Sequence, residues 1–448
     1  MQLKRNIDSI LLDWKNNNSR KPLLLRGARQ VGKSTSVRIL GKQFEYFLEI
    51  NFETEKDIHV FFDGNINVNT ICDKLSIYYN IPIEAGKTLL FFDEIQQCIP
   101  AISAIRYFYE QFASLHLIAA GSLLEFALAE LPSFGVGRIR SVFMYPLSFY
   151  EFLLAKGEPK LIDLIKTGEP LETPFHNKLN EYLRIFLIIG GMPEVVSKYV
   201  DAESLLELQT VLDELQSSII ADFTKYKKNV PSTRLIEVFE SVVKQSGGKF
   251  NLSKASANAN HGQIKEALIL LEKAGLIYPV THSAGNGLPL GAEINDKKKK
   301  YILFDSGIFQ RILGLNIGQF LAANDQEFIN KGTIAETFVG IEIIKNSNPY
   351  TQERLYYWHR EVASSNAEVD YLIHNNGQIL PVEVKASQKG SMQSLLLFMK
   401  EKNTTGLRIS LENFSNLQKI SIIPLYAAGH FLHETTLPLG IKNRKGHG

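Results

Sequence analysis

Residues 23–35, with the sequence LLLRGARQVGKST, place a glycine-rich segment between a short apolar run and the start of a helical pattern. From Gly27 to Ser34 the segment fits G-x-x-x-x-G-K-S without gaps, after a strand and before a helix, as that motif requires. The pattern predicts that backbone N–H groups surround the phosphates of a nucleoside triphosphate, that Lys33 reaches the β and γ phosphates and that the Ser34 hydroxyl binds Mg²⁺. The alternative is a chance glycine-rich turn. The residues expected to hold the nucleotide are Gly27, Ala28, Arg29, Gln30, Val31, Gly32, Lys33, Ser34 and Thr35.

A second motif, LLFFDE at residues 89–94, places the carboxylates of Asp93 and Glu94 at the end of an apolar run. Asp93 is expected to hold Mg²⁺, and Glu94 is expected to orient and deprotonate the attacking water. Alone, such a pair is equally typical of a strand end that faces water. Together with the glycine-rich segment, it favours binding and hydrolysis of a nucleotide.

Two further residues are candidates for the same site. Ser122 follows the apolar run Leu117–Ala120, where a hydroxyl could touch the γ phosphate or the attacking water; the alternative is a turn serine. Arg138 follows a glycine and could neutralise charge in the transition state, within its own chain or in a neighbouring copy. The alternative for Arg138 is an ordinary surface arginine.

The order of apolar runs and helical patterns predicts an α/β protein in three pieces. Residues 1–145 alternate short apolar runs with helix-length segments, which is typical of a parallel sheet buried on both faces. Residues 146–330 are mostly helical by periodicity. Residues 331–448 open with a helix at 334–344 and continue with alternating strands and another helix.

The segments GARQVGKS, LLFFDEIQ, AAGSLLEF and GRIRSVFMYPLSFYEFL together resemble a prokaryotic AAA-type ATPase family. In that family a domain of unknown function usually follows the ATPase, and GGMPEVV at residues 190–196 resembles its usual opening. The resemblance covers nearly the whole chain and implies ATP and Mg²⁺ as cofactors. One departure is Ala120, which stands where many relatives carry threonine or serine, and it weakens the assignment of Ser122.

The middle piece has the order of a winged helix, with three helices, the last of them amphipathic, followed by two strands that flank a lysine loop at 297–300. In such folds one helix enters the major groove of DNA, although the arrangement is also a common spacer. Lys254 and Lys265, with the lysine loop, would contact phosphates if DNA is the partner. Pro279 predicts that the first of the two strands lies at a sheet edge. The expected helices are 232–245, 253–257 and 263–274, and the expected strands are 277–280 and 301–304.

The last piece is expected to contain a hairpin of two strands, at 369–373 and 379–385. In the second strand Glu383 and Lys385 alternate with apolar residues, so both charged side chains lie on one face of an otherwise apolar strand. Asp370, then Glu-x-Lys on the next strand, with Glu336 on the preceding helix, resembles the PD-(D/E)XK nuclease superfamily. The resemblance implies that Asp370 and Glu383 are metal ligands, that Glu336 supports them and that Lys385 positions the water. The alternatives are a salt-bridged hairpin or an inherited nuclease fold that no longer cuts.

Composition places limits on these functions. The 448 residues include 45% hydrophobic and 21% charged residues, and no apolar stretch approaches the ~20 residues of a membrane span. Without a signal-peptide pattern and with two cysteines, we expect a cytoplasmic protein with no membrane partner. Residues 221–300 hold 13 Lys/Arg against 7 Asp/Glu, which is typical of an anionic partner; the alternative for much of this charge is a solvated lysine-rich loop at 297–300. Two functions follow: an ATP-dependent enzyme that cuts DNA, or an ATP-driven switch whose last part binds protein or DNA without cutting. The oligomeric state is left open.

Overall fold

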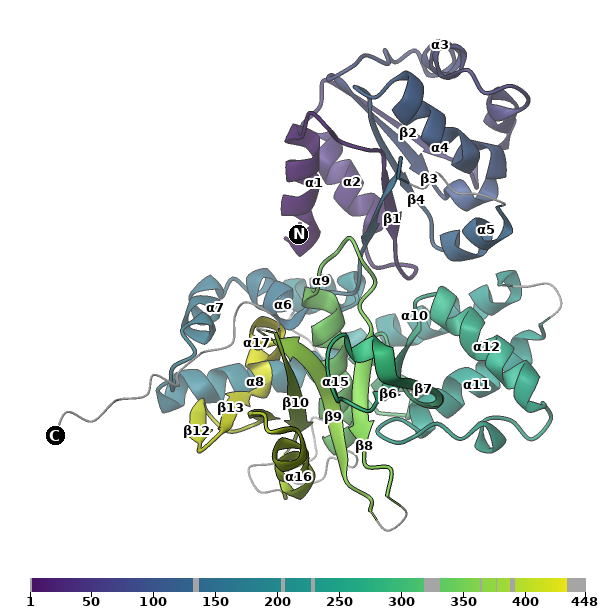
Figure 1. Cartoon of the computed structure of the whole chain (residues 1–448). Helices are drawn as coiled ribbons and strands as arrows, with labels where there is room; N and C mark the ends of the chain where they lie inside the picture. The colour runs from purple at the N-terminus through teal and green to yellow at the C-terminus, as the bar shows by residue number, and fades with distance from the viewer. Residues whose placement is uncertain are drawn as a thin grey trace.

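The structure, a computed structural model, describes residues 2–131, 137–202, 206–226, 230–317, 331–362, 365–375, 377–386 and 391–432. Figure 1 shows two bodies: the N-terminal sheet with its helices at the top, and the helical middle and a second sheet below. Within the described ranges the fold is α/β, with a five-stranded and an eight-stranded sheet.

The first sheet is parallel throughout and has the strand order β2-β3-β4-β1-β5. Every residue of β3 and β4 is buried, because helices cover both faces, and this confirms the sheet expected from the apolar runs. Since the strands are parallel, the segments that follow β1, β3 and β4 emerge at one edge. The strands are β1 (Leu23–Arg26), β2 (Tyr46–Asn51), β3 (Thr88–Asp93), β4 (His116–Ala120) and β5 (Arg140–Phe143), and the helices are α1 (Asn6–Asn16), α2 (Lys33–Gly41), α3 (Val68–Tyr79), α4 (Ile99–Gln111) and α5 (Leu124–Glu130), with short η1 (Lys56–Phe62) and η2 (Ile95–Gln97).

The middle of the chain is helical, as its periodicity predicts. In α6 the Ser148 hydroxyl accepts a hydrogen bond from the Glu151 N–H, and the Glu151 carboxylate accepts one from the Ser148 N–H, which is a capping box. The helices are α6 (Phe149–Ala155), α7 (Pro159–Lys166), α8 (Thr173–Ile189), α9 (Pro193–Ala202), α10 (Glu207–Asp222), α11 (Ser232–Lys244), α12 (His261–Lys273) and α13 (Ser306–Ile312), with short η3 (Phe223–Lys225) and η4 (Leu252–Lys254).

The second sheet is mixed and has the order β12-β13-β11-β10-β9-β8-β6-β7. Its two end strands on one side come from before residue 330, so the sheet crosses the boundary expected between the second and third pieces. The strands are β6 (Ile277–Ser283), β7 (Ile294–Leu303), β8 (Leu355–His359), β9 (Glu368–Asn375), β10 (Gln378–Val384), β11 (Gly406–Ser410), β12 (Ser415–Leu417) and β13 (Ile420–Pro424), and the helices are α15 (Lys331–Asn346), α16 (Gln393–Lys402) and α17 (Ala428–Phe431), with short η5 (Leu290–Glu293) and η6 (Leu425–Ala427).

Two expectations for the β6–β7 hairpin are wrong. Residues 297–300 lie within β7 rather than in a loop, because the strand pairs with β6 and carboxylates on other elements partner its lysines, as Glu361 does for Lys298. Pro279 does not place β6 at an edge, because β6 lies between β7 and β8. The pairing with β8 spans Val280 to His282 only, so the missing N–H of Pro279 lies outside it.

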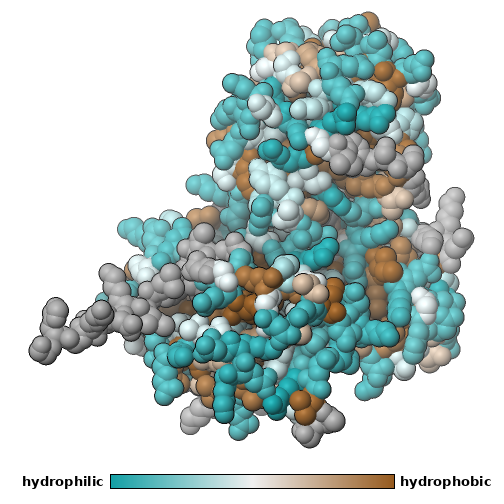
Figure 2. Space-filling model, in the orientation of Figure 1, coloured by the Kyte–Doolittle hydropathy of each residue, from teal (hydrophilic) through white to brown (hydrophobic). Residues whose placement is uncertain are grey.

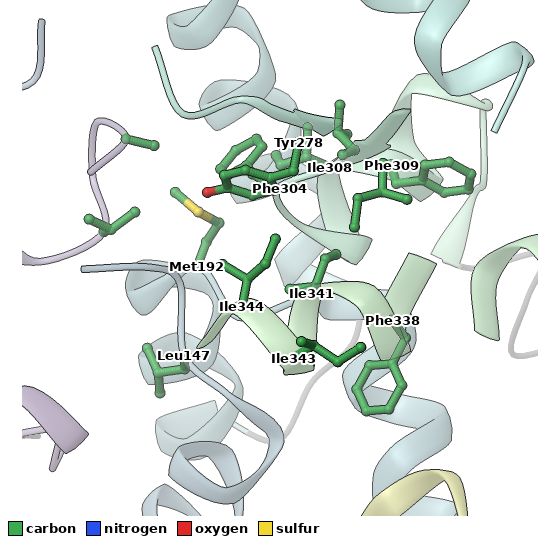
Figure 3. Close-up of a cluster of buried hydrophobic side chains, with 14 of the residues drawn as sticks. Leu147, Met192, Tyr278, Phe304, Ile308, Phe309, Phe338, Ile341, Ile343 and Ile344 are labelled. Atoms are coloured by element: carbon green, nitrogen blue, oxygen red, sulfur yellow. The ribbon is translucent and has the colours of Figure 1, made fainter. Parts of the chain in front are cut away.

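One continuous hydrophobic core joins the two bodies. It begins on one face of the parallel sheet, where Leu25 and Phe91 lie, and extends through the middle helices to α15 and β10. Figure 3 shows the part of this core where side chains from the middle of the chain pack against α15. The residues labelled there are Leu147, Met192, Tyr278, Phe304, Ile308, Phe309, Phe338, Ile341, Ile343 and Ile344.

The face of the molecule shown in Figure 2 is mostly hydrophilic, with brown hydrophobic residues scattered over both bodies. Among the helices described, none is long and apolar enough to cross a membrane.

We predict that Gly191→Ala destabilises the junction between α6 and the segment before α9. A Cβ on Gly191 would lie 2.1 Å from the Leu147 carbonyl oxygen, which belongs to backbone and cannot easily move. We expect a loss of about 1–3 kcal/mol, measured as a lower urea midpoint by tryptophan fluorescence. Gly287→Ala is the control, because a Cβ there meets nothing within 4 Å. Equal midpoints for the two variants would contradict the close packing of this junction.

Candidate functional site

The glycine-rich segment forms a tight loop between β1 and α2. Gly27 and Gly32 have φ values of +140° and +97°, which favour glycine, and Gln30 has a φ of +63°. A Cβ on Gly27 would lie 2.0 Å from the Met144 carbonyl oxygen, so no larger residue fits there. The loop therefore has the backbone that its glycines predict, directly before the N-terminus of α2.

Lys33 is buried and bonds to the loop itself. Its Nζ donates to the carbonyl oxygens of Gly27, at 2.9 Å, and Ala28, at 2.7 Å. Burial lowers the pKa of Lys33 to about 8, although the nearby carboxylates Glu94 and Asp93 partly oppose the shift. A phosphate group would bind this ammonium more strongly than its present partners do, because charged phosphate oxygens would replace neutral carbonyl oxygens.

Asp93 and Ser34 lie together, as the sequence predicts. Asp93 ends β3, its side chain shares a hydrogen bond with Ser34, and its Oδ1 accepts from the Glu94 N–H at 3.0 Å. Burial raises the pKa of Asp93. A hydroxyl and a carboxylate beside a phosphate loop are oxygen ligands of the kind Mg²⁺ prefers, so these residues fit the ion.

Glu94 is oriented by two neighbours on the same edge of the sheet. Its Oε2 accepts hydrogen bonds from the Ser122 hydroxyl, at 3.2 Å, and from the Gln96 amide. The structure therefore brings Ser122 to Glu94. Gln96 was missed, because only the packing shows that its amide lies against Gly121, where a Cβ would be 2.0 Å from Gln96 Oε1.

The structure does not bring Arg138 to the phosphate loop of its own chain. Arg138 forms an ion pair with Glu110, near the C-terminal end of α4. It lies just before β5, whose first residue, Arg140, pairs with Leu23 at the start of β1. This is the amino edge of the sheet, opposite the loop, so a role for Arg138 at the nucleotide of a neighbouring copy stays a prediction.

Other parts of the chain contact the phosphate loop, and the sequence motifs do not include them. Arg29 forms an ion pair with Asp222, at the end of α10, and Lys225 lies 3.4 Å from the same carboxylate. Gly275, just after α12, approaches the loop so closely that a Cβ there would lie 3.3 Å from the Ala28 nitrogen. The middle helices therefore form one wall of the candidate site.

Arg5 joins the phosphate loop to α6 in the interior. Its guanidinium donates to the carbonyl oxygens of Val31, at 2.9 Å, and Tyr145, at 2.7 Å, and forms an ion pair with Glu151 at 3.0 Å. Both side chains of the ion pair are less than a tenth exposed. Arg5 lies outside every motif, and only its position in the fold reveals it.

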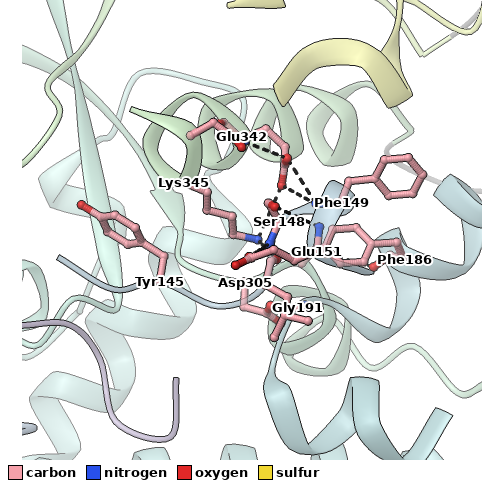
Figure 4. A network of polar contacts seen from close by, with 12 residues as sticks. Tyr145, Ser148, Phe149, Glu151, Phe186, Gly191, Asp305, Glu342 and Lys345 are labelled. Atoms are coloured by element: carbon pink, nitrogen blue, oxygen red, sulfur yellow. Dashed lines mark hydrogen bonds and ion pairs between the residues drawn. The ribbon is translucent and has the colours of Figure 1, made fainter. Parts of the chain in front are cut away.

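Beyond Glu151 the buried polar network continues into α15 (Figure 4). Lys345 Nζ donates to the Leu147 carbonyl oxygen at 2.8 Å, and Glu342 accepts from the Phe149 N–H at 3.2 Å. Burial lowers the pKa of Lys345, against the effect of the nearby carboxylates. The segment 147–151 is therefore bonded to the phosphate loop on one side and to α15 on the other.

A separate cluster of charges lies in the second sheet, where the four residues expected from the nuclease resemblance come together with two that were missed. Lys385 pairs with Glu383 at 2.5 Å, and the Val384 N–H donates to Asp370 Oδ2 at 2.8 Å. Glu336 pairs at 2.9 Å with Lys300 of β7. Lys300 also pairs with Glu368, the first residue of β9, and these are the two missed residues.

Burial sets the electrostatics of this cluster. It raises the pKa of Glu336 to about 8, that of Glu383 to about 7 and that of Asp370. For Lys300, burial alone would lower the pKa, but Glu336, Glu368 and Asp370 more than offset it, so its pKa is raised. Among the described residues, no group of three or more His, Cys, Asp or Glu side chains is arranged to hold a metal ion. The cluster as folded therefore does not fit the Mg²⁺ ions that the nuclease resemblance implies.

Three family models match successive parts of the chain. Residues 19–153 match the family model described as an AAA domain, and residues 180–318 and 331–427 match two domains of unknown function, DUF8612 and DUF4143. With the parallel sheet and the loop geometry, the first match defines a P-loop ATPase domain of the AAA type. The chain thus carries this ATPase domain followed by two domains of unknown function.

The chain is also similar to individual proteins. An uncharacterized protein of Haemophilus influenzae is 23% identical over 379 residues, which are 81% of each chain. The Walker-type ATPase paby2304 of Pyrococcus abyssi has a TM-score of 0.44 at 16% identity, over 70% of this chain and 96% of its own. The Orc1 protein of Aeropyrum pernix, solved in complex with DNA, has a TM-score of 0.32 at 10% identity, over 72% of this chain and 95% of its own. At such values the fold assignment depends on the strand order and the first family match.

We predict that ATP binding takes up a proton above about pH 8. In the free protein burial lowers the pKa of Lys33 to about 8, whereas bound phosphates stabilise the ammonium and raise that pKa again. Affinity should therefore fall as the pH rises above about 8. Calorimetry at about pH 8.5, in buffers of different ionisation enthalpy, measures the uptake. Lys33→Arg is the control, because its guanidinium stays protonated; equal uptake in this variant would show that another group titrates.

Proposed function

We propose that the protein binds ATP with Mg²⁺ and hydrolyses it, and that the nucleotide state changes the contacts of its C-terminal half. The observation that supports this most is the meeting of the phosphate loop, Asp93 and Glu94 at one edge of a parallel sheet. Residues 27–35 would hold the triphosphate through backbone N–H groups, and Lys33 would exchange its carbonyl partners for phosphate oxygens.

Ser34 and Asp93 would hold Mg²⁺, which would neutralise charge on the phosphates. Glu94 would accept a proton from the attacking water as a general base. The Ser122 hydroxyl and the Gln96 amide both donate to Glu94 Oε2, so they fix the carboxylate while its other oxygen can face the water. Ser122 thus acts through Glu94 as a positioning residue, instead of touching the γ phosphate directly.

Two contacts would carry the nucleotide state to the rest of the chain. Arg29 is on the phosphate loop and pairs with Asp222 of α10, so a bound triphosphate would compete with Asp222 for its guanidinium. Arg5 donates to the loop at Val31 and pairs with Glu151, which belongs to the segment bonded to α15. Movement of the loop on binding would therefore shift both α10 and α6.

The nuclease resemblance suggests metal-dependent cleavage of DNA as a second candidate function, but that function needs Mg²⁺, which the cluster as folded does not fit. The convergence of Glu336 from α15, Asp370 from β9, and Glu383 and Lys385 from the end of β10 supports only the nuclease-like placement of these residues. The alternative is a module that binds DNA or protein without cutting, and exposed lysines of the middle piece, such as Lys254 and Lys265, would then contact phosphates. The position of Lys300 among the carboxylates favours this alternative.

We predict that Glu94→Gln retains ATP but hydrolyses it ~10²–10⁴-fold more slowly, because an amide cannot accept the proton. Its oxygen can still accept from Ser122, so the site should keep its shape. Nucleotide binding by calorimetry and phosphate release measure the two effects. Lys33→Ala should lose binding altogether, and Glu45→Gln, an exposed position, should leave both unchanged. Normal turnover by Glu94→Gln would reject its role as the base.

We predict that Arg5→Gln uncouples α15 from ATP. In a Glu94→Gln background, saturating ATP should change amide hydrogen exchange in residues 331–346, because Arg5 and Glu151 link the loop to the network at α15. Arg5→Gln should lose that change while the exchange response of α2 persists. The control is Lys244→Gln, which removes only an exposed pair with Glu240. An undiminished response of α15 in Arg5→Gln would exclude this route.

A further inference from the structure

Lys300 is a buried cation in the middle of the C-terminal carboxylates. Its side chain is 1% exposed, and its Nζ lies 2.9 Å from Glu336 of α15 and in contact with Glu368 of β9. The same Nζ lies 5.1 Å from the ring centroid of Tyr357, a cation–π contact. A buried ammonium is stable only when it is paired, and here two carboxylates and an aromatic face surround it.

The carboxylates that a metal ion would need already accept hydrogen bonds or ion pairs from nitrogen. One oxygen of Glu336 faces Lys300, one oxygen of Asp370 accepts from the Val384 N–H, and one oxygen of Glu383 faces Lys385. Mg²⁺ demands oxygen ligands in near-ideal octahedral geometry at about 2.0–2.1 Å. Glu383 Oε2 is buried without a hydrogen-bond partner, but among the described residues no group of three or more such side chains is arranged to hold a metal ion. An ammonium already lies between α15 and β9.

Lys300 differs from the lysine that the nuclease resemblance leads one to expect. That lysine is Lys385, which lies directly after β10, two residues after Glu383, and is 29% exposed on its side chain. Lys300 comes from β7, the last strand in the sheet order, and reaches both α15 and β9. The cluster therefore contains a second cation, Lys300, which is not part of the Asp…Glu-x-Lys pattern.

We infer that the Lys300 ammonium takes the place of a metal ion in this cluster, so that a cation of the chain itself holds the carboxylates together. The C-terminal part then needs no divalent cation to fold, and its nuclease-like residues form a fixed structural centre. With Lys300 in that place, the cluster does not hold a metal ion that could support metal-dependent cleavage. This inference is independent of the proposed ATPase, whose metal ligands lie in the other sheet.

The inference can be tested in the full chain, without nucleotide, in an Asp93→Asn background that removes the carboxylate expected to bind Mg²⁺ at the phosphate loop. Mn²⁺ serves as the probe, and its binding is followed by the loss of the free-ion signal in electron paramagnetic resonance. We expect no Mn²⁺ bound at the C-terminal cluster of this protein, and the same thermal midpoint with EDTA as with Mn²⁺. Binding of Mn²⁺ that Glu383→Ala abolishes would overturn the inference.

A second arm removes the cation. Lys300→Met keeps an unbranched side chain that is one atom shorter, and it leaves four carboxylates, Glu336, Glu368, Asp370 and Glu383, with Lys385 alone. We expect this variant to gain a bound Mn²⁺, and its thermal midpoint to fall in EDTA and recover with Mn²⁺. The control is Lys298→Met on the same strand, which loses only its pair with Glu361 and should gain nothing.

A folded Lys300→Met that binds no Mn²⁺ would overturn the inference, because the lysine would then be an ordinary ion-pair partner. If this variant does not fold in either condition, the first arm decides by itself. Neither arm depends on ATP hydrolysis, so an inactive ATPase would not be mistaken for a failure of this inference.

Discussion

The guanidinium of Arg5 is the interaction on which the arrangement of the two bodies depends. It satisfies two carbonyl groups, one on the phosphate loop and one before α6, and it neutralises the buried carboxylate of Glu151. Removing one partner of a buried pair typically costs ~3–5 kcal/mol, because the other charge stays buried. Arg5 and Glu151 therefore have to be buried together, and the phosphate loop and α6 must come together for that to happen.

The hydrophobic core reinforces this dependence. One continuous cluster runs from the parallel sheet to α15, so the three parts that the sequence suggests share buried surface in addition to the separate cluster on the other face of the parallel sheet. Domains with small, polar interfaces usually move relative to one another. Here the polar contacts at the phosphate loop are backed by apolar packing, which lets a small shift at the loop reach distant helices.

The sequence predicts the parallel sheet and the phosphate loop well, because both are local patterns. Apolar runs such as 89–92 indicate buried strands, and Gly27 and Gly32 indicate a loop with positive φ. The failures concern residues whose role depends on distant partners. The lysine run at 297–300 looks like a solvated loop until the carboxylates of α15 and β9 are placed around Lys300. Arg138 lies at the amino edge of the parallel sheet, so its role at the nucleotide of a neighbouring copy stays a prediction. Arg5 and Asp222 lie outside every motif, and Gln96 lies in the segment LLFFDEIQ without a role that the motif assigns to it.

The eight-stranded sheet has a consequence for how such chains can be assembled in evolution. Its strands β6 and β7 precede residue 330, and β6 pairs with β8 from the last part. A gene fusion that transferred residues 331–448 alone would leave β8 as an open edge, and open edges pair with foreign strands. The heritable unit at this end of the chain must therefore include the hairpin that supplies β6 and β7, so recombination has to break the chain upstream of residue 277.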